Sequence, residues 1–432
     1  MSHRRTTVKT VGAVLALAVG GGFVTSCGSS SKGATTSTTG SSTSASGALT
    51  TSGASAGTTT RGVTANSITV GGLGYTAFYG DSAIGAQARF AAQNAEGGVN
   101  GRKINFVGFK DDQSTPNVDI QMAKQLVEQE KVFAVLPVIS ITLAAGSYLA
   151  QQHVPFFGWA ISPQFQGNPY GFGVTGLVTN PAYQITIHGV EMARILGKSP
   201  KDLTMAIIGE DSDSAKQSMA PLKYAMESVG YTVVSATNPL PAAPAVVGDY
   251  SPYVSQLITA NHGQAPDVIM EVVGPGNLNL QPALQHAGYK GAMINFVQYS
   301  PQTVAQAKGV YVYLGVASFE AAATTPAVAT MVQQIRAFSP NAPLTGSLEF
   351  GYLAADEFIQ ALKLAGPNLT AESLQNAADH MTYQVPGLVG PTVYPTAQIQ
   401  PDSCGTLVTS DGTKWSVAAP YSCTQAVKYN GG

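Results

Sequence analysis

The sequence predicts an α/β protein with two lobes, each a doubly wound parallel β-sheet covered by helices. Three observations lead to this prediction. Short apolar runs alternate with amphipathic segments of helical length from residue 68 onward, as in consecutive βα units. The alternation stops near residue 180 and then starts again, which indicates a second sheet. The chain has 432 residues, enough for two such lobes.

The first βα unit spans 68–112. A glycine-containing strand at 68–73 leads into a loop with three aromatic residues, and Asp81 can cap the helix that follows. A Gly-Gly pair ends that helix, and a second strand follows at 104–107. The loop lies at the carboxyl end of a parallel strand, which is where open α/β sheets bind their ligands.

The later elements continue the alternation. Pro137 is expected to end the strand before it. Further strands are predicted at 131–136, 153–157, 203–208, 231–235, 267–273, 293–297 and 310–316. Further helices are predicted at 118–130, 143–152, 183–196, 215–229, 253–260, 281–287, 327–338, 348–364 and 369–381.

The N-terminus predicts export. A positively charged start precedes an apolar run at 11–24, too short for a comfortable membrane span. Small residues then precede Cys27, which resembles a bacterial lipobox. We expect a lipoprotein signal peptide at 1–26 and a disordered Ser/Thr/Gly tether at 27–60, because such a segment cannot bury a core. An ordinary signal peptide is the alternative, and the export route is left open.

Composition argues against several kinds of partner and site. Only 11% of residues are charged, and the net charge is -2, so nucleic acid is a poor partner. The six histidines lack metal-binding spacing, and His188 and His286 lie on predicted helices, where a histidine is usually satisfied or solvated. We expect no metal, no cofactor and no enzymatic activity. Cys404 and Cys423 are expected to form a disulfide in an exported chain.

The loops after the first-lobe strands contain the candidate binding residues. Tyr79 follows the first strand, and we favour it as a ligand contact. Ser140 and Thr142 lie before a helix whose free N–H groups suit a carboxylate, although both hydroxyls could simply cap that helix. Trp159 follows the next strand and could stack on a ligand or close the core.

The order of these motifs resembles the type I periplasmic binding proteins, in the branch of leucine/isoleucine/valine-binding receptors of ABC importers. The resemblance covers about 68–394 and is specific in the order and spacing of its short motifs. These motifs are YGD at 79–81, Gly85, NAEGGVNG at 94–101, DD at 111–112 and the long helix at 350–364.

The resemblance implies two discontinuous lobes joined by three hinge crossovers, with the solute held in the cleft. The crossings are expected near 178–181, 317–320 and 386–391. The N-terminal lobe would then contain 66–180 plus 319–387, and the C-terminal lobe 181–318 plus 388–432. The implied protein is a monomeric, extracytoplasmic lipoprotein, anchored to the cell membrane through Cys27, that delivers a small solute to an inner-membrane ABC permease.

The family's binding residues carry over well in the first lobe. Tyr79 matches an aromatic residue that lines the cleft. Ser140 and Thr142 match the loop that holds the carboxylate in amino-acid binders. Ala160 and Ser162 match the loop that contacts the ligand's amino acid group.

The second lobe departs from the family. Asp213-Ser214 occupies the place of a frequent tyrosine, and Gln298 and Tyr299 occupy the place of the acid that binds an ammonium group. Asp213 or Glu271 could replace that acid. We expect a small polar or carboxylated solute, amino-acid-like or related. An amide, a neutral organic molecule or an aromatic acid stays open, because a buried ammonium needs a partner.

Two competing functions remain, an NAD-dependent enzyme and an extracytoplasmic sensor. Residues 72–77 fit the dinucleotide pattern GxGxxG/A, with Glu96 about twenty residues further on. The YGD motif at 79–81 delays the helix, however, so a pyrophosphate would miss the helix N-terminus. The second alternative is an extracytoplasmic sensor that presents its bound state to a signalling partner. Neighbouring permease and ATPase genes would favour uptake.

Overall fold

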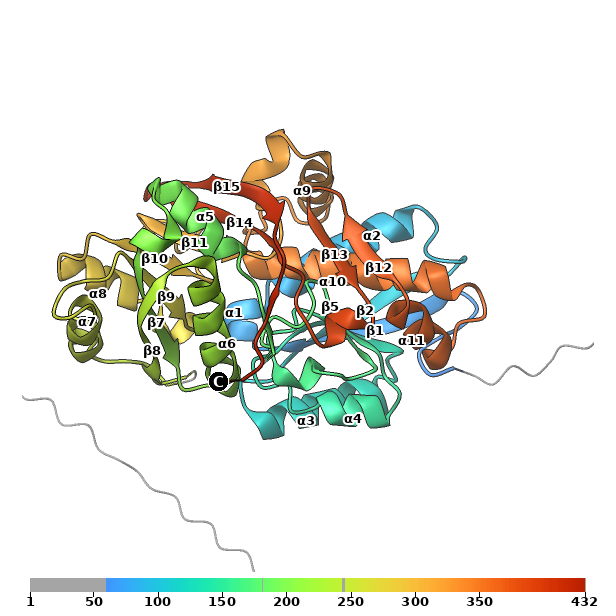
Figure 1. Cartoon of the computed structure of the whole chain (residues 1–432). Helices are drawn as coiled ribbons and strands as arrows, with labels where there is room; N and C mark the ends of the chain where they lie inside the picture. Colours follow the sequence, from blue (N-terminus) through green and yellow to red (C-terminus); the bar gives the residue numbers. More distant parts are fainter. Residues whose placement is uncertain (1–59, 181, 243–244, 432) are drawn as a thin grey trace, which may run out of the picture. The chain divides into compact units, whose positions relative to one another are not determined.

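The computed structural model describes residues 60–180, 182–242 and 245–431. The predicted signal peptide, nearly all of the predicted tether, and Cys27 lie outside the described residues. The α/β fold class is confirmed, with one sheet of five strands and one of seven (Figure 1). Within the described part of the chain, no helix has both the length and the apolar composition needed to cross a lipid bilayer.

The first sheet is entirely parallel, with strand order β2-β1-β3-β4-β5. Its strands are β1 (Ser67–Gly74), β2 (Lys103–Asp111), β3 (Ala134–Ile139), β4 (Phe156–Gly158) and β5 (Gly171–Gly173). Its helices are α1 (Thr76–Tyr79), α2 (Ser82–Ala95), α3 (Pro116–Lys124), α4 (Gly146–Gln151), α9 (Pro326–Phe338), α10 (Gly346–Ala365) and α11 (Ala371–Asp379). Figure 1 shows α3 and α4 on one face of this sheet and α10 with α2 on the other.

Three glycines of this lobe allow backbones to approach closely. A Cβ on Gly85 of α2 would overlap the Leu348 carbonyl of α10, and one on Gly351 would overlap the Ser82 carbonyl. Gly74 of β1 lies in the same way against the carbonyl of Ile139 in β3. The glycines of β1 therefore have a packing role that needs no bound phosphate.

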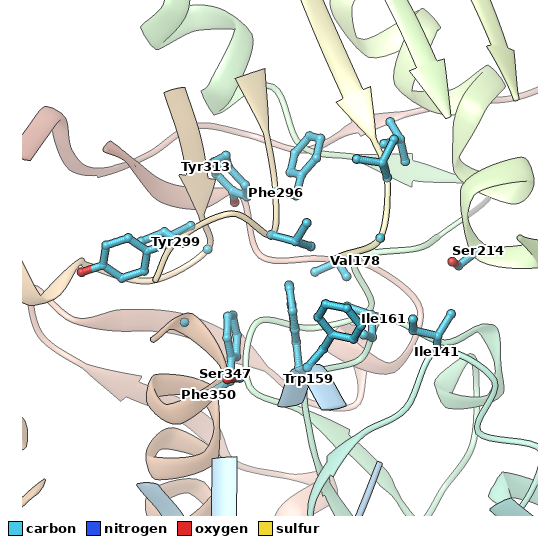
Figure 2. Close-up of a pocket in the computed structure, with 18 of the residues that line it drawn as sticks. Ile141, Trp159, Ile161, Val178, Ser214, Phe296, Tyr299, Tyr313, Ser347 and Phe350 are labelled. Carbon is cyan, nitrogen blue, oxygen red and sulfur yellow. The ribbon is translucent and has the colours of Figure 1, made fainter. Parts of the chain in front are cut away.

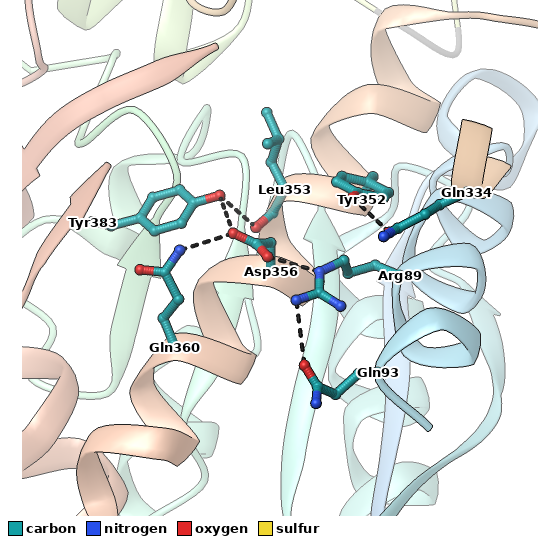
Figure 3. Close-up of polar contacts among 8 residues, drawn as sticks. All are labelled: Arg89, Gln93, Gln334, Tyr352, Leu353, Asp356, Gln360 and Tyr383. Atoms are coloured by element: carbon teal, nitrogen blue, oxygen red, sulfur yellow. Dashed lines mark hydrogen bonds and ion pairs between the residues drawn. The ribbon is translucent and has the colours of Figure 1, made fainter. Parts of the chain in front are cut away.

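A polar cluster joins α2, α10 and β12 (Thr382–Val385) in the first lobe (Figure 3). Arg89 Nε lies 2.7 Å from Asp356 Oδ1, and both side chains are about one-eighth exposed, at 12% and 13%. Gln360 donates to Asp356 Oδ2 at 2.9 Å, and the Tyr383 hydroxyl lies 3.3 Å from the same oxygen. The charges of this cluster are therefore paired where they are partly buried.

The second sheet has the order β15-β14-β11-β10-β9-β7-β8. Its parallel strands are β7 (Thr204–Glu210), β8 (Thr232–Leu240), β9 (Val268–Val272), β10 (Ala292–Asn295) and β11 (Val310–Leu314), and β14 (Cys404–Ser410) and β15 (Trp415–Cys423) add an antiparallel edge. Its helices are α5 (Ile187–Leu196), α6 (Asp213–Val229), α7 (Ser251–Ile258) and α8 (Leu280–His286). Cys404 and Cys423 are opposite each other in this edge hairpin and form a disulfide.

Two predicted elements are wrong in detail. Pro137 does not end its strand but lies inside β3, where a bulge against both neighbouring strands accommodates the missing N–H. The predicted helix at 183–196 begins only at Ile187. Its first residues instead form β6 (Tyr183–Gln184), which pairs with β16 (Val427–Lys428) from the far end of the chain.

The chain passes between the sheets three times. The first passage, 174–186, and the third run side by side, because Leu177 N donates to the Ala397 carbonyl at 2.9 Å and Asp402 N donates to the Thr175 carbonyl at 2.9 Å. The second passage follows β11. The third lies later than the expected 386–391, because β13 (Val389–Val393) pairs with β12 and Tyr394 still bonds to Gly173 of the first lobe.

Candidate functional site

A cavity of about 540 Å³ lies between the two lobes, in the size range of small-molecule sites. The loops after β1, β3 and β4 and the start of α10 line it from the first lobe. The ends of β7, β9, β10 and β11, with their loops, line it from the second lobe. These are the carboxyl ends of parallel strands, so the loops predicted to bind a ligand converge here.

Aromatic rings form much of the cavity wall (Figure 2). Trp159 stacks on Phe350 with ring centroids 4.4 Å apart and an interplanar angle of 13°. Tyr79 packs edge-on against Trp159 at 6.3 Å. Figure 2 shows Phe296 and Tyr313 of the second lobe across the cavity from Trp159 and Phe350. The cavity is therefore suited to a flat or chain-like apolar body.

Three of the predicted site residues, Tyr79, Trp159 and Tyr299, line the cavity. Tyr299 offers its ring rather than its hydroxyl. That hydroxyl donates to Glu320 Oε2 at 2.7 Å and accepts the Phe319 N–H at 3.0 Å.

Ser140 and Thr142 do not line the cavity with their side chains, and Ile141 between them does. The Ser140 hydroxyl donates to Asp119 Oδ2 at 3.1 Å and accepts the Leu143 N–H at 2.9 Å. Burial raises the pKa of Asp119 to about 6. The Ser140 hydroxyl is thus buried beneath the loop and occupied by these two hydrogen bonds.

The same alternation occurs in the loop after β4. Ile161 lines the cavity, while Ala160 and Ser162 are buried behind it. The Ser162 hydroxyl donates to the Thr142 carbonyl at 3.2 Å, so it ties the two loops together. The Ala160 carbonyl accepts the Val178 N–H at 3.3 Å. Two isoleucines thus stand where hydroxyls were expected.

In the second lobe, Tyr299 lines the cavity, but the other candidates, Asp213, Gln298 and Glu271, do not. Asp213 is exposed in the first turn of α6, while its neighbours Ser212 and Ser214 line the cavity. Gln298 is fully buried and accepts from Asn295 at 2.8 Å. Glu271 is fully buried in β9 and bonds to Gln281, and burial raises its pKa to about 8. The acid sought for an ammonium is therefore neither Asp213 nor Glu271.

Two acids that were not predicted as ligand contacts do line the cavity. Glu210, at the end of β7, accepts the Gly274 N–H at 2.7 Å, and burial raises its pKa. Asp81 makes no cap bond to α2 but accepts the Thr345 hydroxyl at 3.4 Å, and burial raises its pKa as well. Among the described lining residues there is no lysine and no arginine.

His188, which was expected to be satisfied or solvated on its predicted helix, is a further cavity residue that was not predicted. It is the second residue of α5, is fully buried and lines the cavity. A sequence signal did exist, because His188 follows Ile185 and Ile187 in the segment that leaves the predicted crossing. No group of three or more metal-ligating side chains occurs in the described part of the chain.

Two doubly wound lobes, three crossover segments and a ligand-sized cavity between the lobes define the class of type I periplasmic binding proteins. The sequence profile of one family, described as periplasmic binding protein, matches residues 67–414. The chain belongs to this family. A comparison with curated proteins found no match.

Several solved structures share the fold. A fatty acid ABC transporter substrate-binding protein from Thermomonospora curvata has 20% identity and a TM-score of 0.70, over 85% of this chain and 95% of that one. An ABC transporter solute-binding protein from R. palustris, in complex with benzoate, has 16% identity and a TM-score of 0.63, over 83% and 98%. A branched-chain amino acid transporter substrate-binding protein from Streptococcus pneumoniae, in complex with isoleucine, has 18% identity and a TM-score of 0.61, over 82% and 100%.

Proposed function

We propose that this chain is the solute receptor of an ABC importer and that it captures a small solute with an apolar body between its lobes. The protein performs no chemistry on the solute. Closure around the solute stabilises the form that an inner-membrane permease binds, and only the solute's higher affinity for the closed form drives that closure.

The observation that carries this proposal is the cavity itself. Its size suits a small molecule, and its walls combine Trp159 and Phe350 of one lobe with Phe296 and Tyr313 of the other. A ligand that touches all four rings would hold the two lobes together. The similar structures of a fatty acid ABC transporter substrate-binding protein and of proteins in complex with benzoate and isoleucine are consistent with a partly apolar solute.

The lining argues for a less polar solute than an amino acid. The hydroxyls of Ser140 and Ser162, which would hold an amino acid's polar groups, are bonded elsewhere. A carboxylate would meet the acids Asp81 and Glu210 without any cation among the described lining residues. Apolar contact with the rings is then the main source of affinity.

We further propose that Cys27 anchors the protein to the outer face of the cell membrane and that the segment before the first strand acts as a tether. Palmitate labelling of cells that express the wild-type chain and the Cys27→Ser variant tests the anchor. Label that persists in Cys27→Ser would overturn it.

Mass spectrometry of small molecules that co-purify with the chain, joined to a thermal-shift panel, tests the binding function. We expect apolar and aromatic solutes to raise the melting temperature by mass action. A panel that gives no shift, together with turnover of any panel compound, would contradict the proposal. Co-purification with a histidine kinase in place of a permease would favour the sensor alternative.

A further inference from the structure

Three polar side chains lie in, or just after, the first passage between the lobes and reach a cavity whose wall is largely apolar. Thr175, Thr179 and His188 all line it, with exposed fractions of 1%, 9% and 0%. Within the described part of the chain, neither threonine hydroxyl has a hydrogen-bond partner, and neither ring nitrogen of His188 has one. Buried polar groups are almost always paired in native proteins, so each of these groups requires an explanation.

Several other polar side chains around the cavity are paired within the protein. The Ser218 hydroxyl donates to the Ser214 carbonyl at 2.9 Å. The Tyr313 hydroxyl donates to the Cys404 carbonyl at 2.6 Å, and that of Tyr299 donates to Glu320. Among the described lining residues, the buried polar atoms without a partner therefore lie close together in the chain, between Thr175 and His188, which indicates a common partner that enters the cavity.

The surroundings of His188 keep its imidazole neutral. Its ring lies 5.6 Å from that of Phe296 and 5.4 Å from that of Tyr313, and contacts of this kind do not replace a buried hydrogen bond. Burial lowers the pKa of His188 to about 3. A neutral imidazole offers one N–H donor and one nitrogen acceptor. A hydroxyl group, which both donates and accepts, can therefore bond to either ring nitrogen.

The charge of the cavity restricts that partner further. The carboxyl groups in the lining are those of Asp81 and Glu210, and no described lining residue carries a permanent positive charge. An anionic head group would be repelled and unpaired. A cation would compete with the Gly274 N–H and the Asn277 amide, which already bond to Glu210. An uncharged head group is neither repelled by these carboxyl groups nor in competition with the hydrogen bonds of Glu210.

We propose that His188, assisted by Thr175 and Thr179, binds the hydroxyl group of an uncharged alcohol or phenol whose apolar body lies among the aromatic rings. This inference rests on the proposed solute-binding function and specifies the chemical class of the solute. The imidazole accepts a hydrogen bond from the ligand hydroxyl or donates one to it. The hydroxyls of Thr175 and Thr179 supply the remaining hydrogen bonds of the ligand hydroxyl.

Calorimetric titration with three matched probes tests the inference: naphthalene, 2-naphthol and 2-naphthoate. The protein is the full chain with Cys27→Ser, which carries no lipid. One neutral hydrogen bond corresponds to about a fivefold gain in affinity, so 2-naphthol should bind about fivefold more tightly than naphthalene. The anion 2-naphthoate should bind more weakly than 2-naphthol.

His188→Phe should remove the preference for 2-naphthol over naphthalene while naphthalene still binds. His188→Gln, which keeps a donor and an acceptor, should retain part of the preference and serves if the phenylalanine variant does not fold. His286→Phe is the matched control, because His286 is exposed on α8 and does not line the cavity.

A preference for 2-naphthol that survives in folded His188→Phe, or tighter binding of 2-naphthoate than of 2-naphthol, would overturn the head-group assignment and leave the solute-binding function standing. Absence of binding by all three probes would instead count against the apolar cavity as a binding site, and with it against both proposals.

Discussion

Two of the regions where polar side chains are wholly or partly buried differ in how those groups are paired. In the first lobe, Arg89 and Asp356 bond to each other and to amide and hydroxyl neighbours. In the first passage between the lobes and at the start of α5, the hydroxyl of Thr175 and the ring nitrogens of His188 have no partner within the described residues. A paired group stabilises the fold, whereas an unpaired group beside a cavity is free to bind a solute.

The largest effect is expected from breaking the paired region. Asp356→Ala leaves the Arg89 guanidinium partly buried without its carboxylate, so the free energy of unfolding should fall by about 3 kcal/mol. Glu227→Ala is the control, because its ion pair with Lys223 is solvent-exposed and is expected to contribute below about 1 kcal/mol. Denaturant titration measures both. Equal losses in the two variants would show that the Arg89–Asp356 cluster adds no stability beyond a surface pair.

The next largest effect concerns the cavity wall. Trp159→Ala removes a ring stacked on Phe350, so the affinity for all three naphthalene probes should fall on the order of tenfold. The preference for 2-naphthol should persist, because His188 is unchanged. Phe338→Ala, on the exposed side of α9, is the control for loss of an aromatic residue. Calorimetry with unchanged affinity in Trp159→Ala would remove Trp159 from the site.

A third prediction concerns pH and another paired group. The Tyr394 hydroxyl lies 2.8 Å from both the Gly173 carbonyl and Glu357 Oε1, and one phenol proton cannot serve two acceptors. A protonated Glu357 would supply the second hydrogen bond, and burial raises the pKa of Glu357 to about 8 from 4.5.

Because its folded pKa lies above its unfolded value, Glu357 contributes stability that is present below pH 4.5 and is lost as the pH rises through about 8. The melting temperature should therefore fall from pH 5 to pH 8. Glu357→Gln keeps a donor for Tyr394 and should reduce that fall, although Glu271 still contributes in the same direction. An identical pH profile in the variant would argue against a protonated Glu357.

The smallest expected effect comes from removing one threonine hydroxyl, and it compares an unpaired hydroxyl with a paired one directly. Thr175→Val removes an unpaired hydroxyl, so the unliganded stability should not fall, while the affinity for 2-naphthol should drop by about threefold. Thr392→Val is the matched control nearby. Its hydroxyl is buried and donates to the Val174 carbonyl at 2.7 Å, so its loss should cost about 1 kcal/mol of stability. A similar loss of stability in both variants would mean that Thr175 is paired after all.

Much of the fold could be predicted because βα units carry their signal locally. Apolar runs, capping residues and glycine stops indicated the order of strands and helices around both sheets. The exceptions depend on distant partners. Tyr183 and Gln184 become a strand only because Val427 and Lys428 pair with them, and nothing in the local sequence reveals this.

The candidate site was predicted to the level of the loop but not of the side chain. Ile141 and Ile161 face the cavity, and their polar neighbours do not, because adjacent side chains in an extended segment point in opposite directions. Ser140 is also drawn away by Asp119, a carboxylate 21 residues earlier in the chain. His188 was missed because a histidine on a predicted helix is usually satisfied or solvated, and its place just after the predicted crossing was not used as a signal.

The position of the unpaired groups on the first passage between the lobes has a consequence for selectivity in transport. A hydroxylated solute would bond to the segment that joins the lobes, whereas a hydrocarbon of the same shape would only fill the space beside it. A solute could then occupy the cavity without stabilising the closed form of the receptor. Hydrocarbons would compete for the cavity without being transported, because a permease that recognises only the closed form would not bind a receptor that holds them.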